Sequence, residues 1–414
     1  MRQPILGYKC TLCGAEFPYQ EMLTCPHCGE KGILDILYDY RAISSYFTKE
    51  TLEANKDKSM WRFSPLMPLK PRDFSPFLHV GASPLYRSNR LGKELGLKEL
   101  YIKDDGINPT ASLKDRASGV AVAKAIELGY DTIACSSTGN AASSCAGNAA
   151  RMGLKTVIFV PERAPEGKLA QLLIFGAHVV SVKGDYRATF ELSRAAIDKY
   201  GWYNRNAGIN PVMVEGKKTV ALEIAEQLNW SVPDWVAVSV GDGCTIGGVY
   251  KGFYDLKELG FIDRIPRILG VQSTGCMPFV DAAKRGGAME PAEENTLADS
   301  IAVGVPRNPV KALRAVLSSR GAWLAVSDEA ILDAMRVLGR TEGVFGEPAG
   351  VTATAGVIEA AHSGLIKGNE AVAVISTGSG LKDVKNALRA AGRPTPCEPD
   401  LKALEKSGIL DGIL

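Results

Sequence analysis

Short apolar runs and longer amphipathic stretches alternate along most of this 414-residue sequence, and no other feature constrains its fold more tightly. Between residues 130 and 200 the expected strands are 132–137, 156–160 and 178–182, and the expected helices are 141–152, 165–175 and 186–199. The run Thr156-Val-Ile-Phe-Val160 has no polar face, which is typical of a parallel strand covered by helices on both sides. Gly129, Gly153 and Gly176 stand where helices should end.

The same alternation returns in the second half of the sequence. Expected strands there are 235–240, 268–272 and 371–376, with helices at 328–341 and 351–363. A short helix at 87–95 and a strand at 99–103 precede the first set. Because 414 residues exceed what one hydrophobic core usually serves, we expect an α/β protein with two doubly wound units instead of one long sheet.

Two cysteine pairs near the N-terminus, Cys10-Thr-Leu-Cys13-Gly and Cys25-Pro-His-Cys28-Gly, have the spacing of a structural zinc site. Two such turns present four thiolates tetrahedrally, and the glycine after each pair permits the tight backbone in which amide N–H groups approach sulfur. A small zinc ribbon is the expected structure. Iron in the same turns, or His27 in place of one cysteine, are the alternatives.

Composition argues against several classes of partner. The formal net charge is +2, there is no basic block, and the cysteine-rich segment carries acidic residues. The sequence therefore gives no reason to expect nucleic acid or an anionic membrane as a partner. No apolar run approaches 18 residues, and the first residues lack the apolar core of a signal peptide, so we expect a cytoplasmic protein. The five other cysteines are solitary and should be reduced thiols.

These patterns divide the chain into five expected segments. Prolines recur between residues 41 and 80 too often for a helix or a central strand, so this part should be a connector. The last segment carries one amphipathic helix, 400–407, suited to packing or dimerisation. In order, the segments are a ribbon at 1–40, the connector at 41–80, a larger α/β domain made of 81–115 and 215–395, a smaller α/β domain at 116–214, and a tail at 396–414.

The stretch Asn108-Pro-Thr-Ala-Ser-Leu-Lys114-Asp-Arg116 places a lysine at the start of a predicted helix, with Thr110 and Ser112 as candidate caps. Helix N-termini favour anions, so the pKa of such a lysine should be lowered, and desolvation would make its amine a nucleophile. The alternative is an ordinary exposed lysine on a first helical turn. Three further stretches favour the functional interpretation.

Each of these three stretches follows a predicted strand. The first combines small hydroxyl residues with a helix N-terminus, which suits a substrate carboxylate, and consists of Ser137, Thr138, Gly139, Asn140 and Ala141. The second lets consecutive amides converge on a phosphate and consists of Gly241, Asp242, Gly243, Cys244 and Thr245. The third places the hydroxyl of Thr377 after a buried strand.

A lysine amine, a phosphate loop, an asparagine and a hydroxyl at strand ends together describe a site for pyridoxal phosphate. Lys114 would form the imine, the loop 241–245 would hold the phosphate, Asn140 would bond the ring hydroxyl and Thr377 the ring nitrogen. A hydroxyl at that nitrogen leaves the pyridine largely neutral, which suits elimination and replacement better than transamination. A nicotinamide cofactor is rejected because the strand after the glycine loop ends in Gln272-Ser-Thr and lacks the required carboxylate.

The same stretches resemble the threonine synthase family of fold-type II pyridoxal enzymes, which have a tryptophan synthase β-like fold. The resemblance covers roughly residues 80–390 and rests on Asn108-Pro-Thr-x-Ser-x-Lys-Asp-Arg116, Ser137-Thr-Gly-Asn-Ala-Ala142, Glu215-Gly-x-Lys-Thr219, Glu347-Pro-Ala-Gly350 and Thr377-Gly-x-Gly-Leu-Lys-Asp383. Many prokaryotic members also carry an N-terminal element with two cysteine pairs. The resemblance implies a homodimer that converts O-phospho-L-homoserine and water to L-threonine and phosphate, with Lys114 moving the protons at Cα and Cβ.

One departure from the family concerns the phosphate of the substrate. Where the family commonly reads Ser-Val-Asn-Pro-x-Arg, this sequence reads Gly208-Ile-Asn-Pro-Val-Met213, and the family's serine and arginine help to bind that phosphate. Losing a bidentate charged contact should be costly for a dianion. Expected substrate contacts that remain are Asn206 and Asn210, and the candidates for the missing charge are Arg205, Lys217 and Arg116.

The departure leaves alternatives open. The protein would keep the fold and cofactor but act on another amino acid, either by β-replacement on O-phosphoserine, as in the similar cysteate synthases, or by serine or threonine dehydration. A non-catalytic regulator that binds a partner through its ribbon is a further alternative. The presence of Lys114 argues against a regulator.

Overall fold

Three separate β-sheets organise the chain, which a computed structural model describes at residues 4–162, 166–184 and 186–411. Pro165, the first residue of one expected helix, lies outside these ranges. The strands are β1 (Ile5–Cys10), β2 (Glu16–Phe17), β3 (Leu34–Tyr38), β4 (Leu85–Ser88), β5 (Glu99–Asp104), β6 (Thr132–Ser136), β7 (Lys155–Pro161), β8 (His178–Val182), β9 (Tyr203–Asn204), β10 (Trp235–Ser239), β11 (Arg267–Ser273), β12 (Ala322–Val326) and β13 (Ala371–Ser376).

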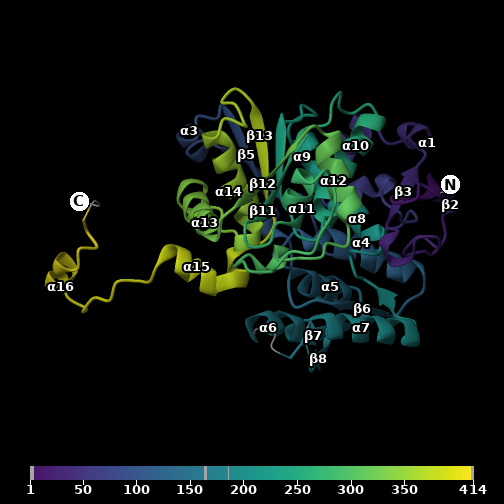
Figure 1. The fold of residues 1–414 in the computed structure, drawn as a ribbon, viewed down its shortest axis with the longest axis horizontal. Helices are drawn as coiled ribbons and strands as arrows, with labels where there is room; N and C mark the ends of the chain where they lie inside the picture. The colour runs from purple at the N-terminus through teal and green to yellow at the C-terminus, as the bar shows by residue number, and fades with distance from the viewer. Residues whose placement is uncertain (1–3, 163–165, 185, 412–414) are drawn as a thin grey trace.

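Helices cover both larger sheets, as Figure 1 shows. The α-helices are α1 (Tyr40–Ser44), α2 (Lys49–Ala54), α3 (Leu91–Glu94), α4 (Lys114–Glu127), α5 (Asn140–Arg151), α6 (Glu166–Ile174), α7 (Tyr186–Tyr200), α8 (Val212–Lys217), α9 (Thr219–Gln227), α10 (Cys244–Glu258), α11 (Pro278–Lys284), α12 (Pro309–Ser318), α13 (Asp328–Glu342), α14 (Pro348–His362), α15 (Val384–Ala391) and α16 (Leu401–Lys406). Short 3-10 turns are η1 (Gly29–Lys31), η2 (Met60–Leu66), η3 (Asp105–Ile107), η4 (Asp299–Ile301) and η5 (Gly380–Asp383).

The two larger sheets confirm the prediction of two α/β units. One has the strand order β12-β11-β10-β13-β5-β4 and is parallel apart from its antiparallel edge strand β4, and the other has the order β8-β7-β6-β9 and is parallel throughout. Along β10, Val236 and Val238 pack into one hydrophobic cluster while Trp235 and Ala237 pack into another. Burial on both faces explains why this strand has no polar side. The loops after β6, β10 and β13 leave from carboxyl ends of parallel strands, where open α/β sheets place their sites.

The N-terminal sheet, with the order β2-β1-β3, is antiparallel and docks against the larger unit. The hydroxyl of Tyr38 donates to Glu215 Oε2 at 2.8 Å, and the hydroxyl of Tyr40 donates to Asp255 Oδ1 at 2.6 Å. Lys311 Nζ on α12 donates to the carbonyl oxygen of Leu34 at 2.7 Å. The ribbon segment is therefore fastened to α8, α10 and α12 by buried polar contacts.

Two local expectations were wrong. Residues 41–80 are not a bare connector, because α1, α2 and η2 form there and Met60, Trp61 and Phe63 are buried in the main hydrophobic cluster. The prolines act as turn residues between short helical pieces, one of them inside η2. The expected helix at 87–95 begins instead as β4, which pairs with β5, and only Leu91–Glu94 is helical.

No helix in the described ranges combines the length and apolar character needed to cross a bilayer. The tail after α15 extends away from the body of the molecule and carries α16 (Figure 1). This helix begins at Leu401, with the Asp400 carboxylate accepting from the amides of Lys402 and Ala403 as an N-cap.

Candidate active site

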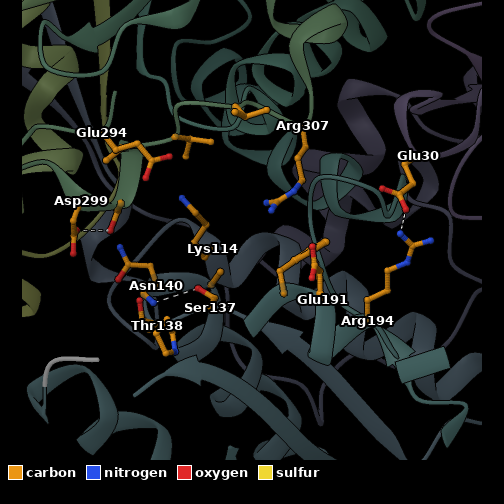
Figure 2. Close-up of a pocket in the computed structure, with 18 residues that line it drawn as sticks. Glu30, Lys114, Ser137, Thr138, Asn140, Glu191, Arg194, Glu294, Asp299 and Arg307 are labelled. Atoms are coloured by element: carbon orange, nitrogen blue, oxygen red, sulfur yellow. Dashed lines mark hydrogen bonds and ion pairs between the residues drawn. The ribbon is translucent and has the colours of Figure 1, made fainter. Parts of the chain in front are cut away.

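Lys114 lies where two cavities meet. The larger cavity, of about 800 Å³, is lined by Lys114 together with residues of the 137–141 loop, α7 and the 299–307 segment. The smaller cavity, of about 80 Å³, is lined by Lys114, Lys217, the 241–246 segment and Thr377. Figure 2 shows the amine of Lys114 pointing into the larger cavity from its floor. All three predicted stretches besides the lysine loop thus converge on one lysine.

The loop before Lys114 is held by the turn that follows β13. The amide of Leu113 donates to the carbonyl oxygen of Thr377 at 2.9 Å, and the amide of Ser379 donates to that of Ala111 at 3.0 Å. The expected caps were wrong, since the N-cap is Leu113 and makes no side-chain cap bond. Instead, the Asp115 carboxylate accepts from the amide of Thr110 at 2.7 Å and from its hydroxyl at 2.7 Å. A carboxylate in the first helical turn therefore pins the loop.

The pKa of Lys114 is lowered to about 8, chiefly by desolvation and then by the nearby positive charge of Lys217. Arg205 lowers the pKa further, while Glu347 raises it. The side chain is half-buried. A lysine with this pKa has an appreciable neutral fraction near neutral pH, which is the form that acts as a nucleophile or a base. The predicted direction of the pKa change therefore agrees with the structure.

The glycine loop forms the wall of the smaller cavity at the N-terminus of α10. Gly243 has a φ of 85°, and a Cβ there would lie 2.6 Å from the carbonyl oxygen of Asn308. A Cβ on Gly241 would lie 2.8 Å from Cα of Ile301. Both positions therefore require glycine, and the free amides of a 15-residue helix face a small cavity. This arrangement suits a phosphate.

The 137–141 loop opens α5 and lines the larger cavity. Within it the amide of Gly139 donates to the Ser137 hydroxyl at 3.2 Å. The side-chain amide of Asn140 donates to Glu347 Oε1 at 2.5 Å, and the amide of Glu347 in turn donates to the carbonyl oxygen of Gly378 at 2.9 Å. Glu347 thus fixes the Asn140 side chain in the wall of the larger cavity, a role that the sequence pattern alone did not suggest.

Two hydroxyl residues, Ser376 and Thr377, lie at the end of β13 and are buried. Thr377 is 7% exposed and lines the smaller cavity. The Ser376 hydroxyl is buried and has no hydrogen-bond partner among the described residues. Thr377 and not Ser376 therefore presents its side chain to the cavity beside Lys114.

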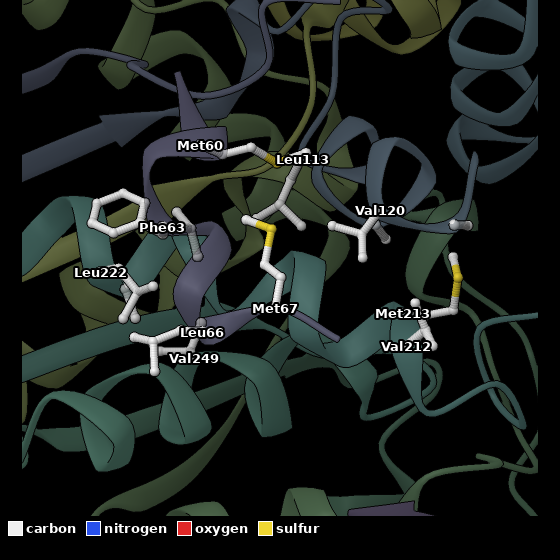
Figure 3. Close-up of a cluster of buried hydrophobic side chains, with 14 of the residues drawn as sticks. Met60, Phe63, Leu66, Met67, Leu113, Val120, Val212, Met213, Leu222 and Val249 are labelled. Atoms are coloured by element: carbon white, nitrogen blue, oxygen red, sulfur yellow. The ribbon is translucent and has the colours of Figure 1, made fainter. Parts of the chain in front are cut away.

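Asn206, Asn210 and Met213 are not among the residues that line the two cavities. Asn210 Nδ2 donates to the carbonyl oxygen of Asn204 at 2.8 Å and its Oδ1 accepts from the amide of Val212 at 3.0 Å, so this side chain braces its own loop. Asn206 Oδ1 accepts from the amide of Ser136 at 3.2 Å, while its buried Nδ2 has no partner among the described residues. Met213 is fully buried and lies beside Val212 in an apolar cluster (Figure 3).

The three candidate replacements for the missing charge have different environments. Arg116 is fully buried and donates to Asp105 and Glu223, so it belongs to an internal ion-pair cluster and not to the cavities. Arg205 donates through Nε and Nη2 to the hydroxyl of Ser118 at 3.1 and 3.0 Å. Lys217 lines the smaller cavity. Of the three, only Lys217 faces a cavity.

Several residues of the larger cavity were missed from the sequence. Arg307 enters from the loop before α12, Phe190 and Arg194 from α7, and Glu30 from the turn after Cys28. Arg194 forms an ion pair with Glu30, so the ribbon segment reaches the rim of the cavity (Figure 2). None of these positions carries a local sequence signal, because each lies in a loop or on a helix face that only the fold brings to the site.

The four N-terminal cysteines lie together as predicted. The sulfur atoms of Cys10, Cys13, Cys25 and Cys28 all lie within 4.8 Å of one another. The amides of Leu12 and Cys13 donate to Cys10 Sγ at 3.4 and 3.5 Å. A Cβ on Gly32 would lie 2.5 Å from that of Cys25, so the turns are closely packed. The donor set suits a tetrahedral thiolate-binding metal.

Comparison with known proteins identifies this geometry. Residues 76–378 match the family model described as "Pyridoxal-phosphate dependent enzyme". The threonine synthase of Methanocaldococcus jannaschii is 40% identical over 401 residues, which cover 96% of this chain and 98% of that protein. The chain belongs to the threonine synthase family of pyridoxal-phosphate enzymes. The threonine synthase of Methanosarcina acetivorans is 38% identical with the same coverage of both proteins.

A solved structure supports the fold alone. The diaminopropionate ammonia lyase of Escherichia coli aligns with a TM-score of 0.66 and 19% identity, covering 84% of this chain and 95% of that one. Membership of this family implies pyridoxal phosphate as the cofactor of the site around Lys114. The loop that only glycine can form and the smaller cavity, which Lys114, Lys217 and Thr377 line, fit that cofactor.

Proposed function

We propose that this protein converts O-phospho-L-homoserine and water to L-threonine and phosphate. The observation that carries the proposal is the position of Lys114, at the junction of a phosphate-sized cavity and a substrate-sized cavity, in a chain that matches threonine synthases over nearly its whole length. The enzyme is accordingly a pyridoxal-phosphate-dependent lyase.

The residues around Lys114 divide between cofactor and substrate. The amides of residues 241–245 would bind the cofactor phosphate, with Lys217 adding charge, and Asn140 and Thr377 would bond the ring. The loop Ser137–Ala141 lines the larger cavity at the N-terminus of α5 and would bind the substrate carboxylate. Asn206 and Asn210 remain predicted substrate contacts, and their side chains also brace the loop that follows β9.

Lys114 is the proposed proton carrier. Pyridoxal phosphate, when bound, supplies an electron sink that weakens the bonds at the substrate α-carbon. Lys114 Nζ, with its pKa lowered to about 8, is suited to accept a proton at Cα and to return one at a neighbouring carbon. Glu347 holds Asn140 in place, and the buried position of the smaller cavity excludes water from the lysine on that side.

Three further parts of the proposal concern the rest of the molecule. A structural zinc ion held by Cys10, Cys13, Cys25 and Cys28 is favoured by their mutual proximity. Four thiolates would leave no open position, so this zinc would be structural and not catalytic. A cytoplasmic location and a homodimer are predictions from the sequence and its resemblance to the family.

A second function keeps the same cofactor and changes the substrate. It is motivated by Gly208 and Met213, which cannot supply the hydroxyl and guanidinium that the family uses for the substrate phosphate. Serine or threonine dehydration would need no such group, and β-replacement on O-phosphoserine would place the phosphate one carbon closer.

The experiment is product analysis of purified, cofactor-loaded protein with three substrates in parallel: O-phosphohomoserine, O-phosphoserine with sulfite, and free threonine. Threonine and phosphate formed in equal amounts from the first substrate alone are expected. Lys114→Ala should abolish this product, whereas Lys257→Ala, an exposed lysine on α10, should leave it unchanged. Phosphate or ammonia released only from one of the other substrates would refute the proposed function and select the second one.

A further inference from the structure

The substrate phosphate needs a cation that the expected positions do not provide. Met213 is fully buried among apolar side chains, and Gly208 has no side chain. The larger cavity is also lined by the carboxylates of Glu191, Glu294 and Asp299, which disfavour a dianion. The cations that line it in the described ranges are Lys114, Arg194 and Arg307.

Arg307 is anchored to the glycine loop through its backbone. Its amide donates to Asp242 Oδ1 at 2.7 Å, and the amide of Asn308 donates to the carbonyl oxygen of Asp242 at 3.1 Å. Asp242 belongs to the loop that forms the smaller cavity. The starting point of the Arg307 side chain is therefore fixed relative to the proposed cofactor phosphate.

From this fixed backbone, the side chain of Arg307 packs directly over Gly208. A Cβ on Gly208 would lie 2.7 Å from Cβ and 2.8 Å from Cδ of Arg307, closer than real contacts permit. Beyond Gly208, the guanidinium lies 4.3 Å from the ring centroid of Phe190 on α7. Figure 2 shows Arg307 and Lys114 reaching into the same cavity from different sides.

The other basic side chains near the site lie in different surroundings. Arg194 pairs with Glu30 at the rim, Arg205 is occupied by Ser118, and Lys217 lies in the smaller cavity. Arg307 is thus the arginine that combines a fixed backbone, a ring that orients its guanidinium plane and a place in the wall of the larger cavity.

We propose that Arg307 binds the phosphate of a phosphorylated amino-acid substrate, and that residue 208 is glycine because the Arg307 side chain occupies the space of a side chain there. A planar guanidinium can make two parallel bonds to phosphate oxygens, which a methionine cannot. The inference rests on the proposed function and deepens it, because it assigns the specificity for a phosphorylated substrate to a residue outside the expected segment.

The test measures binding separately from turnover. Cofactor-loaded protein is titrated calorimetrically with the phosphonate analogue of O-phosphohomoserine, in which a methylene replaces the bridging ester oxygen, with inorganic phosphate and with homoserine. Arg307→Ala should weaken binding of the phosphonate by roughly 100-fold, as expected for loss of a bidentate charged contact, and leave homoserine binding unchanged. Arg307→Lys should recover part of the loss, since it restores the charge but not the two-point geometry.

Two further variants sharpen the test. Gly208→Ser should weaken phosphonate binding as well, because its Cβ displaces the Arg307 side chain. Arg340→Ala removes an exposed arginine on α13 and should change nothing. Phosphonate and phosphate binding by Arg307→Ala equal to that of the unmodified protein would overturn the inference, and so would a failure of the unmodified protein to bind either ligand. Absence of threonine formation by the unmodified protein would instead overturn the proposed function, and the binding data would still decide the role of Arg307.

Discussion

Replacing Lys114 by methionine should stabilise the cofactor-free protein at neutral pH while removing its activity. Lys114 is half-buried beside Lys217, and its pKa falls from 10.5 to about 8. One pKa unit corresponds to about 1.4 kcal/mol, so the native state disfavours the protonated amine by roughly 3 kcal/mol. Because partial exposure to solvent screens part of this cost, we expect a gain of about 2–3 kcal/mol for the methionine variant at pH 7.

The direction of the pH dependence follows from the lowered pKa. Below pH 8 the lysine is protonated in both the native and the unfolded chain, so the full cost is present. As pH rises from 8 toward 10.5, the native state loses its proton first and the unmodified protein gains stability. The advantage of Lys114→Met should therefore shrink over this range and vanish at its upper end.

Urea unfolding of the cofactor-free protein between pH 7 and pH 10.5 measures this effect, with midpoints and slopes compared for both chains. Lys257→Met, which removes an exposed lysine from α10, is the matched control and should show no gain. An unchanged midpoint for Lys114→Met at neutral pH, or a gain that persists at high pH, would show that the site does not disfavour a charged amine.

Three further outcomes are expected. Arg116→Met should lower the free energy of unfolding by about 3–5 kcal/mol in urea titrations, because it removes the cation paired with the buried Asp105 and one of the two cations paired with Glu223. Arg87→Ala, in a largely exposed pair, should cost less than about 1 kcal/mol. Tyr38→Phe should cost about 1–2 kcal/mol by the same assay, since it removes one of two donors to the buried Glu215 Oε2, and Lys218 still donates to that oxygen. Removing metal with a strong chelator should release one zinc ion per chain and make Cys10, Cys13, Cys25 and Cys28 reactive toward a thiol reagent, and Cys397→Ser should not alter the zinc content.

The sequence predicted those parts of the fold in which local chemistry and tertiary environment agree. Strands such as β10 were recognisable because both faces are buried, and the glycine loop because Gly241 and Gly243 cannot carry side chains. Residues 41–80 were misjudged since their prolines suggested open chain, while Met60, Trp61 and Phe63 provide enough apolar surface to bury short helical pieces.

The residues of the candidate site likewise fall into those that the sequence predicted and those that it did not. Lys114, Asn140 and Thr377 stand at strand and helix ends, where position along the chain already indicates position in space. Arg307 enters the cavity from a loop about 100 residues beyond Gly208, and nothing in either local sequence links the two. Only the three-dimensional packing of the Arg307 side chain over Gly208 shows that the two residues are linked.

The docking of the N-terminal segment has a consequence for the order in which the protein is made. The segment is synthesised before its partners, which are separated from it by 177 residues at Glu215, by 215 residues at Asp255 and by 277 residues at Lys311. These contacts therefore cannot form until the chain has been synthesised at least as far as Lys311. All four cysteines are synthesised well before the partners of this segment, so the proposed zinc site can form before the segment is secured to the larger unit.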